Sequence, residues 1–406
     1  MTKGIHNYSD IGKLNRVLMH RIGREVEGIV PDNLEDMLFD DIPYLKAAKK
    51  EHDKYVSVLE ANGVEVCYYT EEAAKAISSP ETKTEFISEF LDRSTIRTGE
   101  LREILMEYLS SKEPADLIET VIAGVKRSDV PQPKRVTLAD YIYASDLYYL
   151  HPMPNLYFSK DPAACIGDGV CVNHMRMRAR RRESLLMKYI VKYNKDFAPG
   201  EVNLWYDYDD VESLEGGDIM ILNNHTLIVG LSQRTSALGI QTLAKRLLGD
   251  SGFHRIVVFD IPKRRAFMHL DTVFTMVDYD KFTIHSEILD SVGIYEVYLN
   301  RDGEVRFSTI TDSMADMLKK LLHVPAVKLI HVGGNDSMAA QREQWNDGTN
   351  TLCIEPGKII TYDRNYITNN ALESNGLHVI PIPSAELSRG RGGPGCMSCA
   401  VNRDDL

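Results

Sequence analysis

The chain has 406 residues, 43% of them hydrophobic, so it can bury a large core and divide into more than one structural unit. Its formal net charge of −12 argues against binding to nucleic acid. The first residues lack the apolar core of a signal peptide, and no uninterrupted apolar run approaches membrane-spanning length. We therefore expect a cytoplasmic protein that binds neither nucleic acid nor a membrane.

The N-terminal third of the chain predicts one unit of strands and a helix, at residues 17–69, followed by a helical insertion. From 71 to about 136 the sequence is polar and helix-prone, and its apolar residues recur at helical spacing. These apolar residues are Phe86, Ile87, Phe90, Leu91, Leu101, Ile104, Leu105 and Leu109. We expect residues 71–136 to form a small helical bundle without catalytic residues, inserted into a catalytic unit of residues 1–70 and 137–406.

The rest of the chain repeats a pattern of strand, turn, strand, helix and strand. Such units are predicted at 156–204, 219–261, 273–330 and 351–382. The last is the clearest: strands 351–354 and 358–362 flank a turn, and the helix 365–375, closed by Gly376, precedes the strand 377–382. In the unit 219–261 the corresponding strands are 219–222, 226–231 and 254–261, with a helix at 237–248. Five units predict radial repetition, with the loops of one face meeting at the axis.

The segment 388–399 places Cys396 in a glycine-rich loop that has no evident packing role. Glycine lets a backbone approach a ligand closely, and the loop's two arginines, Arg389 and Arg391, favour a thiolate. Cys396 and Cys399 also form a Cys-x-x-Cys pair, which leaves a redox dithiol or a zinc site as alternatives. A redox pair would normally open a helix, and a zinc site would need a second ligand pair, which is missing at that spacing. The six scattered cysteines are predicted to be reduced thiols.

Three further segments, 158–162, 215–218 and 268–275, each place a carboxylate at a predicted strand end. Asp161, Glu215 and His269 are spaced 54 residues apart in both intervals (215 − 161 and 269 − 215), which indicates one contribution per repeat. Alone, each segment is more typical of a turn or of a surface hydrogen-bonded pair. The basic run 176–182 is typical of a solvated helix start, or of a site for a local anion such as a substrate carboxylate.

Together these segments resemble the arginine deiminase family of the guanidine-modifying superfamily. The resemblance also includes the acidic loop 35–43 and the segments 155–158, 232–236 and 344–350, and it spans essentially the whole chain. It implies an α/β fold, a five-bladed α/β propeller of ββαβ repeats with an inserted helical bundle. It also implies hydrolysis of free L-arginine to L-citrulline and ammonia, in arginine catabolism, without cofactor or metal. We expect L-arginine and water as substrates, and a homo-oligomer.

The resemblance assigns a role to each matching residue. A guanidinium carbon is a poor electrophile until carboxylates hold its nitrogens and a soft thiolate attacks it. Cys396 would be the nucleophile that forms an amidino-cysteine, and His269 the general acid and base. Asp161 and Asp271 would pair with the guanidinium, and Glu215 would contact it and orient His269. The substrate-binding residues would be Asn155, Phe158, Arg180, Asp218, Arg234 and Arg391. Of these, Arg180 and Arg234 would bind the α-carboxylate, and Arg391 would pair with an active-site carboxylate and move on substrate binding.

The chain departs from the family pattern at three positions. Lys160 stands where members usually have arginine, Gly395 where they have a basic residue, and Ala400 where proline is frequent. Lys160 keeps its charge without a planar fork, and Gly395 removes a cation next to the thiol, which leaves the pH profile open. Two alternatives remain: a metallohydrolase that uses His269, Asp271, Glu215 and Asp161 as ligands, or a catalytically impaired arginine-binding relative.

Overall fold

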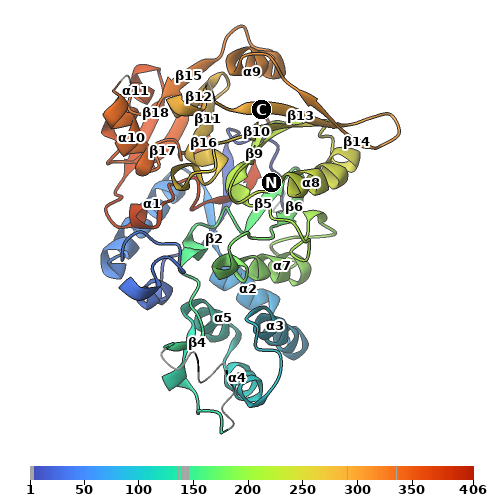
Figure 1. Cartoon of the computed structure of the whole chain (residues 1–406), viewed down its shortest axis with the longest axis vertical. Helices are drawn as coiled ribbons and strands as arrows, with labels where there is room; N and C mark the ends of the chain where they lie inside the picture. The colour runs from blue at the N-terminus through green and yellow to red at the C-terminus, as the bar shows by residue number, and fades with distance from the viewer. Residues whose placement is uncertain (1–3, 135–137, 139–141, 143–145, 290, 335) are drawn as a thin grey trace.

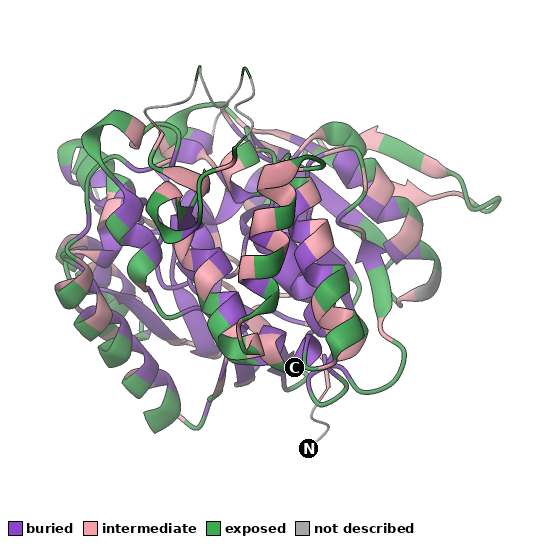
Figure 2. Ribbon diagram, turned by 90° about the horizontal axis from the view of Figure 1, so that it is seen from below, coloured by how far each residue is buried: buried purple, intermediate pink, exposed green. Residues whose placement is uncertain are grey.

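The computed structural model describes residues 4–134, 138, 142, 146–289, 291–334 and 336–406. The chain forms an elongated body with its sheets in the upper part and a group of helices at the lower end (Figure 1). Figure 2 shows that the outer helices expose one side while the strands behind them are largely buried. In the part of the chain described, no helix is both long enough and apolar enough to span a bilayer.

Five sheets share one arrangement: an antiparallel strand pair whose second strand pairs in parallel with a third strand. Each arrangement includes a helix. One unit consists of β5 (Ala163–Ile166), β6 (Gly169–Val172), α7 (Glu183–Tyr193) and β7 (Asn203–Tyr206). The next consists of β8 (Ile219–Asn223), β9 (Thr226–Leu231), α8 (Ala237–Asp250) and β10 (Arg255–Asp260). Two more are β11 (Phe274–Asp278), β12 (Lys281–Ile284), α9 (Met314–Leu322) and β15 (Lys328–His331), and β16 (Leu352–Glu355), β17 (Lys358–Tyr362), α11 (Tyr366–Ser374) and β18 (His378–Ile382). The helix α10 (Ser337–Trp345) lies between these last two units in the chain. The four units lie where the sequence predicts them.

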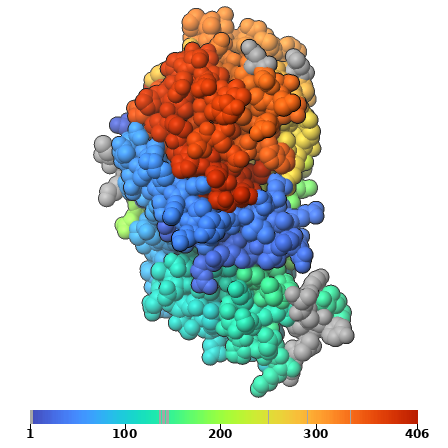
Figure 3. All heavy atoms as spheres, turned by 90° about the vertical axis from the view of Figure 1, so that its left-hand side faces the viewer, coloured from blue at the N-terminus to red at the C-terminus, as the bar shows by residue number. Residues whose placement is uncertain are grey.

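The fifth unit joins the two ends of the chain. Strand β1 (Leu14–Met19) pairs in parallel with β2 (Glu65–Tyr68), after the helix α1 (Leu45–Ala61), and antiparallel with the last strand, β19 (Cys399–Arg403). Figure 3 accordingly shows N-terminal and C-terminal segments side by side on one face. The predicted unit 17–69 is therefore incomplete in itself, because β19, which corresponds to the first strand of the other units, comes from the C-terminal end of the chain.

The unit of β11, β12, α9 and β15 contains a hairpin that the sequence did not reveal. Strands β13 (Gly293–Leu299) and β14 (Val305–Thr309) leave their own sheet and extend that of β8, β9 and β10 to five strands, in the order β14-β13-β10-β9-β8. The hairpin projects from the body at the right of Figure 1.

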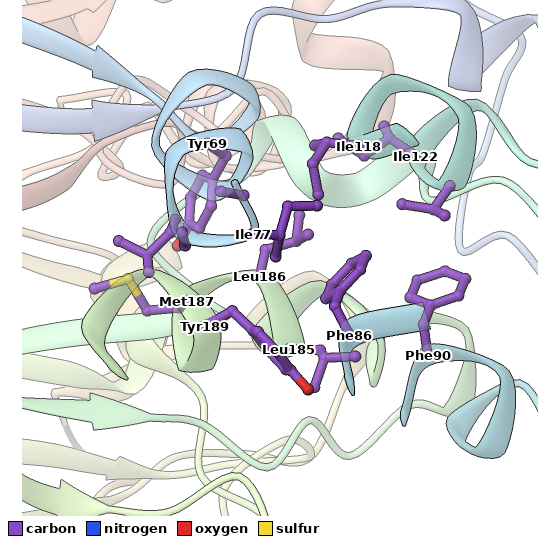
Figure 4. Packing of buried hydrophobic residues seen from close by; sticks show 14 of the residues in the cluster. Tyr69, Ile77, Phe86, Phe90, Ile118, Ile122, Leu185, Leu186, Met187 and Tyr189 are labelled. Carbon is purple, nitrogen blue, oxygen red and sulfur yellow. The ribbon is translucent and has the colours of Figure 1, made fainter. Parts of the chain in front are cut away.

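The predicted insertion is helical. It contains α2 (Tyr69–Ala76), α3 (Pro80–Arg93), α4 (Glu100–Ser110) and α5 (Pro114–Ala123), and the short strands β3 (Val125–Lys126) and β4 (Tyr148–Leu150) follow. Its predicted end, at residues 136 and 137, lies outside the described residues. Phe86 packs edge-on against Tyr189 of α7, with ring centroids 5.1 Å apart, so the helices share one core with the β5–β7 unit (Figure 4).

Candidate active site

Each of the five units contributes a side chain from the segment that precedes its first strand. Asp161 lies before β5, Glu215 before β8, Asp271 before β11, Asn350 before β16 and Cys396 before β19. All five side chains are buried. His269 lies between Glu215 and Asp161, and the thiol of Cys396 contacts Asp271 and Asn350. The two groups form one cluster because Asp161 is close enough to Cys396 to raise the pKa of its thiol. The structure thus brings together the five residues predicted to be catalytic and adds an asparagine.

The thiol of Cys396 lies between an acceptor and a donor. Its Sγ is 3.8 and 3.9 Å from the two carboxylate oxygens of Asp271, and the side-chain amide of Asn350 donates to it at 3.0 Å. Burial raises the pKa of Cys396 well above its usual value, and the nearby Asp271 and Asp161 raise it further. In the absence of another cation the sulfur is therefore a neutral thiol at pH 7.

The imidazole of His269 is held on one side by Glu215. Its Nε2 lies 2.8 Å from Glu215 Oε2, while its Nδ1 lies 3.7 Å from Asp161 Oδ1, beyond hydrogen-bonding distance. Burial alone would lower the pKa of His269, but Asp161 and Glu215 reverse that effect and raise it to about 9. His269 is thus an imidazolium at pH 7, with Nδ1 as the nitrogen left for proton transfer.

The carboxylate of Glu215 is held in its ionised form by its neighbours. Burial would raise its pKa, but Arg234 and the hydrogen bond from His269 lower it to about 2. The backbone N–H of Arg176 also donates to its Oε1 at 2.9 Å. The glycine two residues later, Gly217, allows this packing, since a Cβ there would lie 2.7 Å from His269 Nδ1.

Asp161 has one satisfied oxygen and one without a partner. Arg180 Nη1 donates to its Oδ2 at 2.5 Å, whereas Oδ1 is fully buried and accepts no hydrogen bond from any described residue. A buried carboxylate oxygen without a donor is costly, so Oδ1 favours a ligand that brings an N–H. That oxygen faces Nδ1 of the His269 imidazole.

Lys160 forms an ion pair with Asp271, its Nζ lying 3.1 Å from Oδ2. Burial would lower the pKa of Lys160, but Asp271 and Asp10 raise it, so the residue stays cationic. The lysine therefore pairs with Asp271 through a single contact, without the fork that a guanidinium would supply.

The two arginines expected at the substrate carboxylate differ in their partners. Arg180 is saturated by protein groups: it binds Asp161, donates from Nε to Glu183 at 3.0 Å, and donates from Nη2 to the carbonyls of Asn155 and Phe158 at 3.2 Å each. Among the described residues, the guanidinium of Arg234 makes only long contacts, 3.5 Å to Glu215 and 3.6 Å to the sulfur of Met268. Arg234 consequently has more capacity for an anionic ligand.

Arg391 makes its closest contacts with Trp345 and with the acidic loop. Its guanidinium stacks 3.5 Å from the ring centre of Trp345, and its Nη1 is 3.8 Å from Asp40 in the acidic loop. Burial raises the pKa of the neighbouring Asp347 to about 7, although Arg391 acts in the opposite direction. The contacts of Arg391 are thus with Asp40 and Trp345, and its pairing with an active-site carboxylate on substrate binding stays a prediction.

Three further residues that we expect to line the substrate site contact neighbouring loops. Asn155 donates to the carbonyl of Met37 at 2.8 Å, and the ring of Phe158 packs beneath the glycine-rich loop at Gly392. Asp218 accepts from the backbone of Leu270 at 2.9 Å and from the hydroxyl of Ser232 at 2.6 Å. Burial raises the pKa of Asp218 to about 6.

Sequence reasoning did not select Asn350 as a site residue. The available signal was its position, because Asn350 lies two residues before β16, as Asp161 lies two residues before β5. Among the described residues, no group of three or more His, Cys, Asp or Glu side chains is arranged to hold a metal ion. Cys396 and Cys399 are both free and buried.

Comparison with known proteins places this site in a family. The sequence model of the arginine deiminase family matches residues 35–403. The chain is 46% identical over 411 residues to the arginine deiminase of Latilactobacillus sakei subsp. sakei, with both chains fully covered, and 46% identical over 410 residues to that of Bacillus cereus, again with full coverage.

Solved structures share the mixed α/β fold at much lower identity. An amidinotransferase from Microseira wollei superposes with a TM-score of 0.54 at 15% identity, covering 99% of this chain and 98% of its own. The DDAH of Pseudomonas aeruginosa, in complex with citrulline, gives 0.54 at 14% identity, with 95% and 98% covered. The fold, together with the full-length relatives, leads to one conclusion: the chain belongs to the arginine deiminase family.

Proposed function

We propose that the chain hydrolyses free L-arginine to L-citrulline and ammonia through an amidino-cysteine on Cys396. The observation that carries the proposal is the buried pair of carboxylates, Asp161 and Asp271, beside a thiol and an imidazolium. Such a cluster favours a planar cation that donates several N–H groups, which a guanidinium supplies.

In the first half-reaction the guanidinium donates to Asp161 Oδ1 and to Asp271, and its charge favours ionisation of Cys396. The thiol proton leaves to solvent, and Sγ forms a bond with the guanidinium carbon. His269 gives its proton to the departing nitrogen as the C–N bond breaks. Ammonia, a neutral imidazole and an amidino-cysteine cation result.

In the second half-reaction neutral His269 accepts a proton from water while the water oxygen bonds to the amidino carbon. The C–S bond then breaks, its electron pair returns to Sγ, and the hydroxyl proton passes to solvent, which leaves the ureido group of citrulline. Glu215 keeps the imidazole oriented throughout, because its hydrogen bond fixes Nε2.

The arrangement of the five units also bears on the architecture of the whole chain. We infer that the five units are the blades of a five-bladed α/β propeller, because each supplies the loop before its first strand to one cluster. Residues 71–136 are the helical insertion and residues 1–70 and 137–406 the catalytic part, and the protein acts as a homo-oligomer in arginine catabolism.

The test is incubation of the purified protein with L-arginine and a chelator, followed by colorimetric detection of citrulline and mass spectrometry of acid-quenched protein. We expect citrulline, and an amidino adduct on Cys396. Cys396→Ala should lose several orders of magnitude in turnover, while Cys399→Ala, the matched control three residues away, retains most of it. Loss of activity on chelation would support a metallohydrolase. Arginine binding without citrulline would support an impaired relative.

A further inference from the structure

Asn350 contacts the nucleophile twice. Its Oδ1 accepts the backbone N–H of Cys396 at 2.9 Å, and its Nδ2 donates to Sγ at 3.0 Å. The side chain is 1% exposed, so neither contact competes with bulk water. Because a backbone N–H can only donate, the oxygen of the amide must face it, and the NH₂ group must therefore face the sulfur.

The surrounding backbone fixes this amide. The N–H of Asn350 donates to the carbonyl of Asp347 at 3.0 Å, closing a turn in which Asp347 has the left-handed φ of 59°. A Cβ on Gly395 would lie 2.9 Å from Asn350 Oδ1, so the glycine-rich loop leaves the space that the amide occupies. The amide is consequently positioned before any substrate binds.

Charges around the sulfur act against ionisation. Asp271, Asp161 and Asp347 oppose a thiolate, and Lys160 favours one. Among the described residues that hydrogen bond Sγ, Asp271 is an acceptor and Asn350 the donor. A donor fixed on a sulfur that gains negative charge stabilises that charge without reorganisation.

We propose that Asn350 is a catalytic residue whose side-chain N–H stabilises negative charge on Cys396 Sγ when the thiolate forms and when the C–S bond of the amidino-cysteine breaks. The proposal rests on the amidino-cysteine mechanism proposed above. It assigns Asn350 to both half-reactions, because sulfur carries charge before attack and again as the leaving group.

Asn350→Asp separates this role from a structural one. The aspartate keeps an oxygen to accept the Cys396 N–H, and it replaces the donor with a second anionic oxygen. Asn194→Asp is the matched control, because Asn194 is also buried, its Oδ1 accepts backbone N–H groups at 3.1 Å, and its Nδ2 donates to Glu72 at 2.7 Å. Asn194 lies at the end of α7 and contacts no residue of the cluster.

The first measurement is the pH dependence of alkylation of Cys396 by iodoacetamide, without arginine. We expect Asn350→Asp to move the midpoint upward by at least one pH unit and Asn194→Asp to leave it unchanged. The second is kcat, which should fall by about 10²- to 10³-fold in Asn350→Asp with KM changed only a few-fold, as for removal of one oxyanion donor.

The results of these two measurements either support or contradict the role of Asn350. An unchanged alkylation midpoint in Asn350→Asp, or a loss of kcat matched by Asn194→Asp at equal loss of Tm, would overturn the proposal. If Asn350→Asp does not fold, Asn350→Ala removes the donor without adding charge and should shift the midpoint in the same direction. A parent protein that makes no citrulline would refute the proposed function. Alkylation requires no turnover, so the alkylation midpoints of the parent and of Asn350→Asp would still show whether Asn350 stabilises the thiolate.

Discussion

At the scale of single residues, proton positions decide how the site works. His269 carries a proton at neutral pH because Asp161 and Glu215 raise its pKa to about 9. In the proposed mechanism that proton passes to the departing ammonia, so kcat/KM should fall as the pH rises through the pKa of His269.

Glu215→Gln tests this assignment. Glutamine still accepts a hydrogen bond but removes the negative charge that raises the pKa of His269, so that pKa should drop. We expect the alkaline limb of the kcat/KM profile to move to lower pH by one unit or more, with a lower maximum. A limb that stays in place would show that another group sets it.

Gly395 is a position where sequence and structure give opposing expectations. From the sequence, restoring a basic residue with Gly395→Arg should lower the pKa of the adjacent thiol. The structure adds a steric cost, since any Cβ lies 2.9 Å from Asn350 Oδ1 and 3.0 Å from the carbonyl of Thr351.

The charge can be isolated by comparing Gly395→Arg with Gly395→Ala, which share that steric cost. Gly395→Ala should slow citrulline formation relative to the parent. Relative to Gly395→Ala, Gly395→Arg should move the alkylation midpoint of Cys396 to lower pH. Identical midpoints in the two variants would mean that a cation at 395 does not reach the thiol.

Motif spacing selected Asp161, Glu215 and His269, which recur at a constant interval, and the glycine-rich segment 388–399 selected Cys396. It did not predict the partners of Arg180. The carboxylate of Glu183, three residues on, joins Asp161 in neutralising that buried guanidinium, and this depends on tertiary packing. Asn350 was missed because asparagine is common in turn-prone sequence for purely local reasons.

At the scale of elements, the repeated pattern predicted strands and helices within the chain to within a few residues. Strand β9 lies at 226–231 and β17 at 358–362, as expected. Pairing across long separations was not predictable: β19 joins β1, and the hairpin β13–β14 joins a neighbouring sheet. A strand's alternation indicates that it has a buried face, without indicating which sheet it completes.

Helix α3 offers a test of whether the insertion is an independent part. Phe86 is 0% exposed and contacts Phe90 and Tyr189, so its ring belongs to a core shared with α7 (Figure 4). Phe86→Ala should reduce the free energy of unfolding by about 3–5 kcal/mol. The kcat of the folded variant should stay close to that of the parent, because no residue of the site lies in α3.

Urea unfolding followed by circular dichroism measures this loss. Val211→Ala, at a side chain 87% exposed, is the control and should change stability by less than about 0.5 kcal/mol. A separate early transition in Phe86→Ala, with activity lost only in a later one, would show that the insertion unfolds on its own and that the shared core does not couple the two parts.

At the scale of the whole molecule, the fold brings one pre-strand segment from each of five units to a single cluster, where we propose that the substrate cation binds. The negative charge of the chain suits a cationic substrate, but it does not distinguish arginine from other guanidines. To select arginine over other guanidines, the site needs a group that binds the α-carboxylate. Among the described residues, the guanidinium of Arg234 makes only long contacts, at 3.5 Å to Glu215 and 3.6 Å to Met268. The guanidinium of Arg180 is instead held by Asp161, Glu183 and two backbone carbonyls.

We therefore expect free L-arginine to exceed agmatine, which lacks the carboxylate, by about 10⁴-fold in kcat/KM, as in sites that hydrogen bond a polar substrate group. Arg234→Ala should narrow this gap by harming arginine while leaving agmatine nearly unchanged. Arg180→Ala should instead harm both substrates and lower the Tm, because it leaves Asp161 and Glu183 buried without their cation. Steady-state kinetics on both substrates, with Tm measured for each variant, separates the two roles. Comparable rates of the parent on arginine and agmatine would show that Arg234 serves structure, and that the carboxylate does not select the substrate.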